Sequence, residues 1–274
     1  MTPDDAEALK MMVQSRSGVL VNADNTYQIE SRLGPIARRE GKASVDELIA
    51  AIRSNRDERL MWAVTEAMVN TESWFFRDSE PFDRLRKDIL PRLAAARSRP
   101  IRIWSASCAG GQEAYSLAMA VAEERPSLGD ARIELFGSDI SEACIHKAQS
   151  GLYNPFEAQR GLPIRMLLRY FEKQDEMWKA RSDLAGALRW RRINLLSDLT
   201  PLGTMDVIFC RNTVNAFDRS SRRRVLEQFR GLLVEDGYLF LGLDEGADDI
   251  EGFYPAAGLP GVYTRTPDRQ VEAA

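Results

Sequence analysis

The stretch Ile101–Met119 (IRIWSASCAGGQEAYSLAM) constrains the fold of this chain more than any other. It begins as a short apolar run with β-branched and aromatic residues, which is typical of a buried strand. Small residues interrupt it at Ser105–Gly111, and apolar residues then return at helical spacing. A small-residue turn between strand and helix exposes backbone N–H groups and the positive end of the helix dipole. The turn is therefore either a cofactor loop or a close-packed connection, because Gly110–Gly111 does not match G-x-G-x-x-G.

Strands and helices continue to alternate beyond this stretch. Strands are predicted at Arg132–Gly137, Met205–Cys210, Gly237–Gly242 and Gly261–Arg265. Helices are predicted at Glu142–Gln149 and Arg222–Leu233. This alternation predicts a parallel sheet covered by helices. Asp139 follows the second strand, where nucleotide-binding folds hold ribose hydroxyls, and its alternative role is to cap the next helix.

The first part of the chain, residues 1–69, is predicted to be a separate helical domain, followed by a larger domain over residues 70–274. Amphipathic segments begin near Asp4, Tyr27 and Ser44, and Ser44 with Glu47 forms a capping-box pattern. The second segment carries three arginines among its polar positions, namely Arg32, Arg38 and Arg39. These are either a solvated helix face or a docking face for an acidic partner.

The segment Gly151–Arg192 interrupts the alternation of strands and helices. A helix is predicted at Ile164–Phe171, followed by short strands at Met177–Ala180 and Ala187–Arg192 around a polar turn at Ser182–Asp183. We interpret residues 151–192 as an inserted, small antiparallel β-subdomain.

Composition excludes several classes of function. The formal net charge of −4 gives no general attraction to nucleic acid or to an anionic membrane. No apolar run approaches the roughly 20 residues that span a bilayer, and the acidic N-terminus lacks a secretory signal, so we expect a cytoplasmic protein. Three widely spaced cysteines fit reduced thiols, and a single histidine, His146, disfavours multi-histidine metal sites. We expect no metal.

Eight short motifs, in their order along the chain, resemble the CheR-type chemoreceptor methyltransferases. The motifs are FFRD at Phe75–Asp78, WSASCAGGQEAYSLA at Trp104–Ala118, SDI at Ser138–Ile140, GLY at Gly151–Tyr153, RYF at Arg169–Phe171, NLL at Asn194–Leu196, DVIFCRN at Asp206–Asn212 and LFLG at Leu239–Gly242. The resemblance extends over nearly the whole chain.

This resemblance implies a fold, a reaction and a partner. The fold would be α/β: a doubly wound, Rossmann-like class I methyltransferase sheet with an inserted antiparallel β-subdomain, preceded by an all-helical N-terminal subdomain. The reaction would transfer a methyl group from S-adenosylmethionine to glutamate carboxylates of chemoreceptors, leaving S-adenosylhomocysteine. The N-terminal helices would help to dock the receptor, which favours the docking role of the three arginines. We expect no nucleic-acid partner, no membrane insertion and a monomer.

The resemblance also places the family's cofactor contacts on residues of this chain. They fall on Thr71, Ser73, Arg77, Glu113, Asp139, Asn194, Leu195, Arg211 and Asn212. Asp139 would accept hydrogen bonds from the ribose, Asn194 and Leu195 would border the adenine, and Glu113 would offset the cationic methionine end. Arg77 would engage a carboxylate of cofactor or substrate and is the candidate catalytic residue.

The sequence departs from the family pattern at several of these motifs. Thr71 stands where the family has asparagine, Gln112 where it has glutamate, and Leu243–Asp244 where it has His-Ser. Ala216 replaces a tyrosine next to the methyl-transfer site. Loss of one orienting hydrogen bond to a charged group costs about 1.5 to 3 kcal/mol, or roughly 10- to 150-fold in rate.

One further expectation concerns the docking of a receptor peptide. The hairpin near Lys173–Lys179 lacks the glycine of relatives that tether a receptor peptide, so we do not expect tethering. Two alternatives to an active receptor methyltransferase stay open at this point. One is an S-adenosylmethionine-binding regulatory protein with weak or lost catalysis, which Ala216 and Thr71 motivate, and the other is methylation of a small molecule or another protein.

Overall fold

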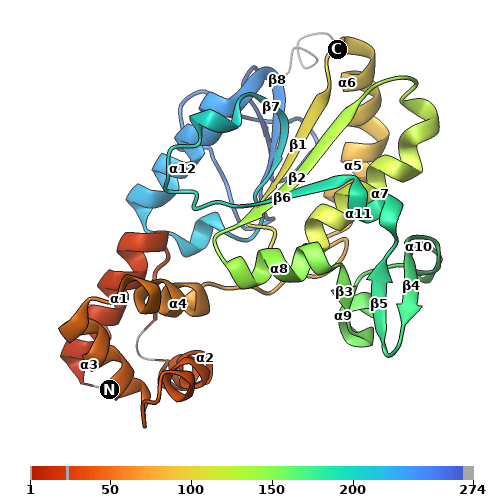
Figure 1. The fold of residues 1–274 in the computed structure, drawn as a ribbon. Helices are drawn as coiled ribbons and strands as arrows, with labels where there is room; N and C mark the ends of the chain where they lie inside the picture. Colours follow the sequence, from red (N-terminus) through yellow and green to blue (C-terminus); the bar gives the residue numbers. More distant parts are fainter. Residues whose placement is uncertain (1, 23–24, 268–274) are drawn as a thin grey trace. The chain divides into compact units, whose positions relative to one another are not determined.

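The computed structural model describes residues 2–22 and 25–267, which form two compact units (Figure 1). One unit comprises Met1–Asn70 with the short segments Asn194–Leu196 and Val214–Val225. The other comprises Thr71–Ile193, Ser197–Thr213 and Leu226–Ala274. No helix of the described residues is long and apolar enough to cross a membrane.

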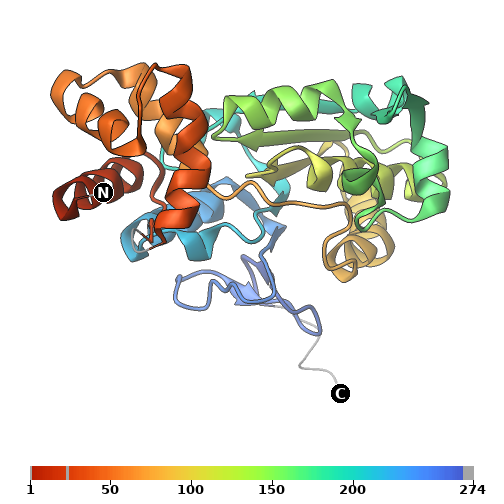
Figure 2. The same cartoon turned by 90° about the horizontal axis from the view of Figure 1, so that it is seen from below.

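The first unit is built from helices, as the sequence predicts. They are α1 (Pro3–Ser17), α2 (Thr26–Arg39), α3 (Val45–Asn55), α4 (Glu58–Met68), the short turn η4 (Val214–Ala216) and the first half of α12 (Arg219–Leu232). The apolar faces of α1 to α4, drawn in red and orange in Figure 2, meet in one core around Leu9, Val13, Leu33, Leu48 and Val64, all of them buried. An isolated bridge pairs Val19 with Phe217, which explains why a segment so far along the chain belongs to this unit.

Side-chain caps define where these helices begin. The hydroxyl of Ser44 accepts from the Glu47 backbone N–H at 3.2 Å, which confirms the predicted start of α3. Asn25 caps α2 and Asp57 caps α4 in the same way. Each cap satisfies a backbone N–H that has no partner within its own helix.

The second unit is organised around a seven-stranded sheet of order β6-β2-β1-β7-β8-β10-β9. Its strands are β1 (Ile101–Ala106), β2 (Ile133–Asp139), β6 (Leu188–Arg192), β7 (Met205–Phe209), β8 (Leu233–Phe240), β9 (Tyr254–Pro255) and β10 (Val262–Thr264). The first five run parallel, and β10 pairs antiparallel with β8 and β9. The chain therefore forms the doubly wound sheet that the alternation predicts.

Helices cover both faces of this sheet (Figure 1). On one side lie α5 (Glu80–Arg84), the π-helical turn η1 (Leu85–Ile89), α6 (Leu90–Ala96) and α7 (Gln112–Glu124). The second half of α12 covers the other side, where Phe229 packs edge-on against Trp104 of β1. Helix α8 (Glu142–Ser150) connects β2 to the small sheet, and η2 (Arg125–Ser127) and η3 (Thr200–Leu202) are short turns.

A small three-stranded antiparallel sheet lies within this unit, seen at the lower right of Figure 1. It consists of β3 (Leu152–Tyr153), β5 (Met177–Ala180) and β4 (Phe171–Gln174), accompanied by α9 (Pro155–Gln159) and α10 (Ile164–Tyr170). Phe75, Tyr153 and Phe171 pack edge-to-face in its core. Asp175, with φ of 52°, turns the β4–β5 hairpin without a glycine.

Two details of the predicted insertion are wrong. The predicted strand at Ala187–Arg192 is β6 and pairs in parallel with β2 of the large sheet, through registers such as Leu188 with Leu135. The predicted turn at Ser182–Asp183 is the start of helix α11 (Ser182–Gly186). A short alternating strand looks the same in either sheet, and only its partner strand distinguishes the two.

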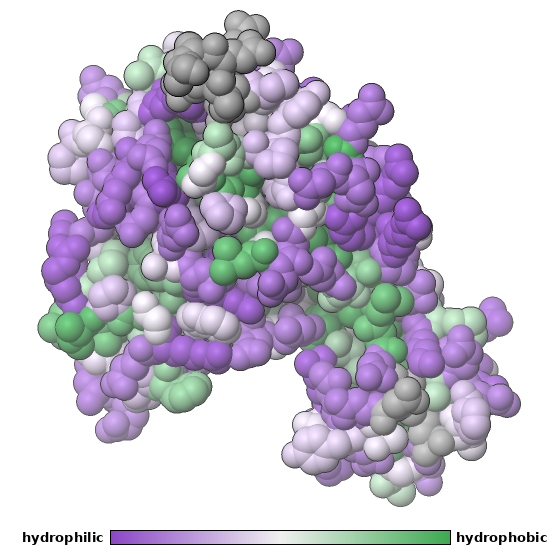
Figure 3. All heavy atoms as spheres, turned by 180° about the vertical axis from the view of Figure 1, so that it is seen from behind, coloured by the Kyte–Doolittle hydropathy of each residue, from purple (hydrophilic) through white to green (hydrophobic). Residues whose placement is uncertain are grey.

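The face shown in Figure 3 is largely hydrophilic, with several patches of apolar residues among the polar ones. The exposed large hydrophobic residues include Met11, Tyr27, Phe156 and Leu243.

Candidate functional site

The candidate site lies where β1, β2 and β7 end. β1 is an inner strand of the sheet, with β2 on one side and β7 on the other, so the connections leave in opposite directions from this point. Such a reversal opens a crevice at the carboxyl ends of the strands, where open α/β sheets bind ligands.

The loop after β1 has an unusual backbone. Ser107, Ala109 and Gly111 all have positive φ, of 59°, 48° and 93°. A Cβ on Gly111 would lie 2.7 Å from Cβ of Ala148, so only glycine fits there. Non-glycine residues in this region are strained and tend to cluster at functional sites.

Asp139 joins this loop to the end of β2. Its Oδ2 accepts from the Ala109 N–H and its Oδ1 from the Ser141 N–H, both at 2.9 Å. Ser141 itself caps α8 through the Cys144 N–H. Asp139 therefore does more than cap a helix. Its carboxylate joins the loop after β1 to the residue that caps α8.

Glu113, in the first turn of α7, is a buried carboxylate with partners. Its Oε1 accepts from the hydroxyl of Ser105 at 2.8 Å, and its Oε2 lies 3.6 Å from Nη1 of Arg211. Burial raises the pKa of Glu113; Arg211 and the Ser105 hydrogen bond oppose the rise, and the charge of Glu245 adds to it. The result is a carboxylate fixed in position and shielded from water.

Arg211 follows β7 and connects it to the loop that contains Arg77. Its Nη1 donates to the Arg77 carbonyl at 2.9 Å and its Nη2 to Asp78 Oδ2 at 2.7 Å. The Arg211 side chain is 1% exposed. Among the described residues, its Nε has no hydrogen-bond partner. A buried, unpaired donor on a charged group indicates a position for an anionic ligand group.

Arg77 lies in the loop Thr71–Ser79, whose residues Phe76 and Asp78 also have positive φ. The Phe76 N–H donates to the hydroxyl of Ser116 on α7, which anchors the loop. The guanidinium of Arg77 stacks on the ring of Trp74 at 4.2 Å, and that of Arg160 lies 4.1 Å from the same ring. Among the described residues, no carboxylate lies within salt-bridge distance of Arg77, and its charge acts at longer range on Glu113, where it opposes the rise in the pKa.

Asn212 has a left-handed backbone, with φ of 58°, and an exposed side chain. Its N–H donates to Oε2 of Glu245 at 2.7 Å. The remaining predicted residues of this unit, Thr71 and Ser73, precede Trp74 in the Arg77 loop, where Thr71 is exposed and Ser73 half-buried. The structure thus places seven of the nine predicted cofactor residues in one unit, on loops or at the ends of α7 and β2.

The other two, Asn194 and Leu195, belong to the unit with the N-terminal helices. They follow β6, but the Nδ2 of Asn194 donates to the Arg16 carbonyl at 2.6 Å, and Leu195 is buried. Their proposed place beside an adenine ring stays a prediction.

The three arginines predicted for docking differ in their surroundings. Arg32 is half-buried and donates to the carbonyls of Met68 and Val69 at 2.6 and 3.2 Å, at the end of α4. Burial lowers its pKa. Arg38 and Arg39 are exposed, and Arg39 lies 3.4 Å from Glu40. Only the last two present their charge to solvent.

Three residues of the site were missed from the sequence: Ser105, Asp78 and Glu245. Ser105 is the polar residue of a buried apolar strand, which is a signal that its hydroxyl has a partner. Asp78 and Glu245 lie within or next to recognised motifs, but nothing local shows that their partners are Arg211 and Asn212.

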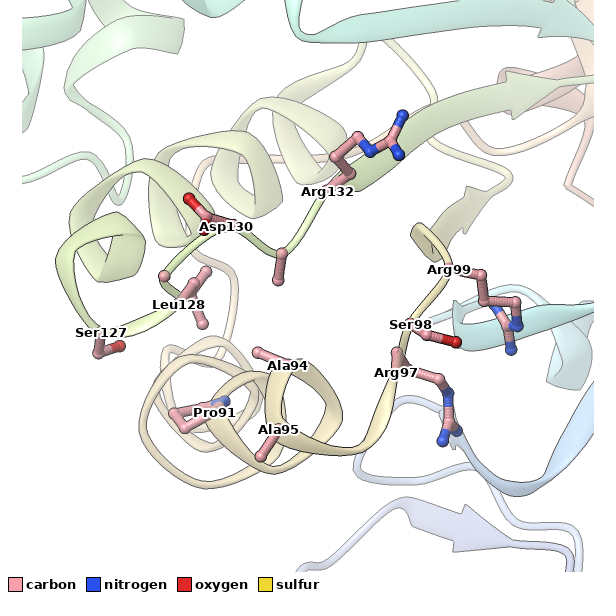
Figure 4. A pocket seen from close by; sticks show the side chains of 12 residues that line it. Pro91, Ala94, Ala95, Arg97, Ser98, Arg99, Ser127, Leu128, Asp130 and Arg132 are labelled. Atoms are coloured by element: carbon pink, nitrogen blue, oxygen red, sulfur yellow. The ribbon is translucent and has the colours of Figure 1, made fainter.

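A cavity of about 530 Å³ lies elsewhere, at the opposite ends of β1 and β2 (Figure 4). Arg97 and Arg99 line it but turn their guanidinium groups away from it, toward Asp206, with which both form ion pairs. These two arginines therefore offer no unpaired charge to a ligand in the cavity. No group of three or more potential metal ligands is found among the described residues.

Comparisons with known proteins identify the family. A family model described as "CheR methyltransferase, SAM binding domain" matches residues 71–257, and one described as "CheR methyltransferase, all-alpha domain" matches residues 4–68. Chemotaxis protein methyltransferase 1 of Pseudomonas aeruginosa is 33% identical over 95% of this chain and 97% of its own length. Cher2 of Pseudomonas putida is 31% identical (91% and 93%), and the Escherichia coli chemotaxis protein methyltransferase is 29% identical (95% and 90%).

Proposed function

This chain belongs to the CheR methyltransferase family, and we propose on that basis that it methylates glutamate side chains of chemoreceptors. It is an S-adenosylmethionine-dependent methyltransferase of chemotaxis. The finer assignment, that the product is a glutamate methyl ester on a receptor, is the proposal. The observation that carries it is the loop cluster with Arg77 unpaired beside the buried pair of Glu113 and Arg211.

The residues present fit the cofactor. The unpaired Nε of Arg211 suits its carboxylate, and the buried carboxylate of Glu113 suits its cationic end. Asp139 lies at the end of β2, where the carboxylate of a doubly wound sheet suits ribose hydroxyls. When bound, the cofactor supplies an activated methyl group on a sulfonium.

The acceptor needs little proton chemistry. A glutamate with a pKa near 4.3 is already ionised at neutral pH, so no general base is required. The protein has to remove water from that carboxylate and hold its oxygen about 3 to 3.5 Å from the methyl carbon. We assign this to Arg77, whose planar guanidinium pairs with carboxylates and is held against Trp74. The near-absence of histidine therefore does not argue against activity.

We propose a division of labour between the two domains predicted from the sequence. Residues 70–274 would hold the cofactor, and residues 1–69 would dock the receptor through Arg38 and Arg39. The natural partner would be the cytoplasmic part of a chemoreceptor, so the protein would act in the cytoplasm. The two alternatives, methylation of a small molecule or another protein and cofactor binding with weak or lost catalysis, are not favoured. The matched relatives are named as chemotaxis methyltransferases.

The test is transfer of labelled methyl groups from S-adenosylmethionine to purified receptor cytoplasmic domains. We expect label that is released as methanol in mild alkali, because esters hydrolyse there and N-methyl groups do not. Arg77→Ala should abolish transfer, whereas Arg84→Ala, an exposed arginine with surface ion pairs, should not. Alkali-stable label, or no label on any receptor encoded with this protein, would refute the glutamate assignment.

A further inference from the structure

Glu245 is a buried carboxylate to which the sequence comparison with the family assigns no role. It lies five residues beyond the end of β8 and is 7% exposed. Its Oε2 accepts two backbone hydrogen bonds, from Asn212 N–H at 2.7 Å and from Gly242 N–H at 2.8 Å. One oxygen atom thus joins the segment after β7 to the segment after β8.

The geometry of Asn212 depends on this contact. Its φ of 58° is a left-handed conformation that side chains rarely adopt and that needs support from its surroundings. The oxygen of Glu245 that accepts the Asn212 N–H gives this support. It fixes the peptide plane that precedes the Asn212 side chain, and with it the direction in which the carboxamide leaves the backbone.

Gly242, which has no side chain, leaves room for Asn212 and Glu245. A Cβ on Gly242 would lie 2.8 Å from Asn212 Nδ2 and 2.9 Å from Glu245 Oε2. Glycine at position 242 is therefore what allows the Asn212 carboxamide and the Glu245 carboxylate to lie side by side. The residue before Asn212 is Arg211, whose guanidinium contacts Asp78 and Glu113.

We propose that Glu245 is a positioning residue of the cofactor site, which holds Asn212 in the conformation that contacts S-adenosylmethionine. The role of Glu245 depends on the proposed function in one respect only, that the ligand is S-adenosylmethionine. The hydrogen bonds of Glu245 to Asn212 and Gly242 do not depend on it. Glu245 acts through Asn212 and does not itself touch the reacting atoms.

Three substitutions separate this role from a general effect on stability. Glu245→Gln keeps an oxygen acceptor of the same reach and loses the charge. Glu245→Ala removes the acceptor, and Glu245→Asp shortens it by one methylene. Asp248→Ala is the matched control, because Asp248 lies in the same segment and accepts from the Tyr263 hydroxyl at 2.8 Å.

Two measurements are made on each variant: calorimetric affinity for S-adenosylmethionine, and amide hydrogen exchange at residues 212 and 242. We expect Glu245→Ala and Glu245→Asp to weaken binding by about 10-fold or more and to lose protection at both amides. Glu245→Gln should bind within about threefold of the wild type, because an uncharged oxygen still accepts both bonds. Asp248→Ala should match the wild type in both measurements.

The outcomes are distinguishable. The proposal would be overturned if Glu245→Ala and Glu245→Asp both bound S-adenosylmethionine with wild-type affinity. It would also be overturned if Glu245→Gln bound as weakly as Glu245→Asp, since the charge of Glu245 rather than its position would then be the cause. If Glu245→Ala does not fold, the Gln and Asp variants decide between the two. A wild-type protein that does not bind S-adenosylmethionine would refute the proposed function instead, while amide protection would still report on Glu245.

Discussion

Nη1 of Arg211 lies 3.6 Å from Oε2 of Glu113, and both side chains are buried. Arg211 follows β7 and Glu113 lies in the first turn of α7, so the contact joins the segment after β7 to this helix. Because interactions between charges strengthen as water is excluded, the pair keeps Glu113 in a defined place with little exposure. The charges near the proposed cofactor are therefore set before any ligand binds.

Replacing Glu113 by Gln should weaken S-adenosylmethionine binding more than S-adenosylhomocysteine binding. The substitution keeps the side-chain shape and an acceptor for Ser105 but removes the negative charge. Only the first ligand carries a sulfonium, so we expect its affinity to fall about 10- to 100-fold, and that of the product less. Calorimetry with both ligands measures the difference.

Glu123→Gln is the control for that experiment. Glu123 lies on the same helix, has a side chain that is 8% exposed, and pairs with Arg165 and Arg169 instead. Its substitution should leave both affinities unchanged.

The raised pKa of Glu113 also predicts a pH dependence. On acidification, the wild-type protein should lose affinity for S-adenosylmethionine at a higher pH than it would if the pKa of Glu113 were that of an ordinary glutamate. Glu113→Gln should not show this loss. Equal losses for both ligands would contradict the proposed role.

Arg32→Ala and Arg38→Ala should have different consequences. Arg32 donates to two carbonyls at the end of α4, so its loss should lower the free energy of unfolding by about 1.5 to 3 kcal/mol. Arg38 is exposed, and its substitution, alone or with Arg39→Ala, should leave stability unchanged and raise KM for the receptor. Urea denaturation measures the effect on stability, and steady-state assays on the same samples measure the effect on KM. A raised KM without a loss of stability in Arg32→Ala would count against a structural role for Arg32.

Asp206→Asn should destabilise the protein by about 3 to 5 kcal/mol, because it leaves two arginines without their buried partner. Asp206 lies at the start of β7 and accepts from Arg97, Arg99 and the Arg102 N–H. Asp236→Asn, at the exposed second partner of Arg97, should cost less than about 1 kcal/mol.

The difference between Asp206→Asn and the wild type should depend on pH. Burial by itself would raise the pKa of Asp206, but hydrogen bonds from Arg99, Arg102 and Arg97 outweigh it and lower the pKa below its ordinary 3.8. A lowered pKa stabilises the folded state above the unfolded value and loses that contribution as the pH falls through the folded one. Unfolding curves for the two proteins should therefore converge in acid below about pH 3.8 and separate above it. A constant difference would refute this account.

Ala216→Tyr should raise the rate of methyl transfer. The backbone at this position is already held, since the Ala216 carbonyl accepts from the Leu20 N–H at 2.8 Å, and the side chain is half-buried. A tyrosine would restore one orienting hydroxyl, for which we expect about a 10-fold gain in kcat. Ala216→Phe adds the ring without the hydroxyl and should give no gain. A rate unchanged in both variants would assign the orienting role to another group, such as Asn215.

The sequence by itself determined the local features of this protein. The strand of Ile101–Ala106, the helix that follows it, the cap of Ser44 and the parallel alternation all follow from residues within a few positions of one another. The motifs, taken in order, also indicated the family. These signals can be read along the chain because hydrogen bonds within a helix, side-chain caps and the alternation of a strand are local.

Only the tertiary structure decided which distant side chains meet. It assigned β6 to the large sheet, Glu113 to Arg211, Glu245 to Asn212, and Arg32 to the end of α4. Each of these pairs joins segments whose separation along the chain carries no periodic signal. These contacts are stable because burial excludes water from them. Burial in turn depends on how whole strands and helices pack. For that reason the stretch Ile101–Met119 indicated where a site would form, and the packed sheet established which groups form it.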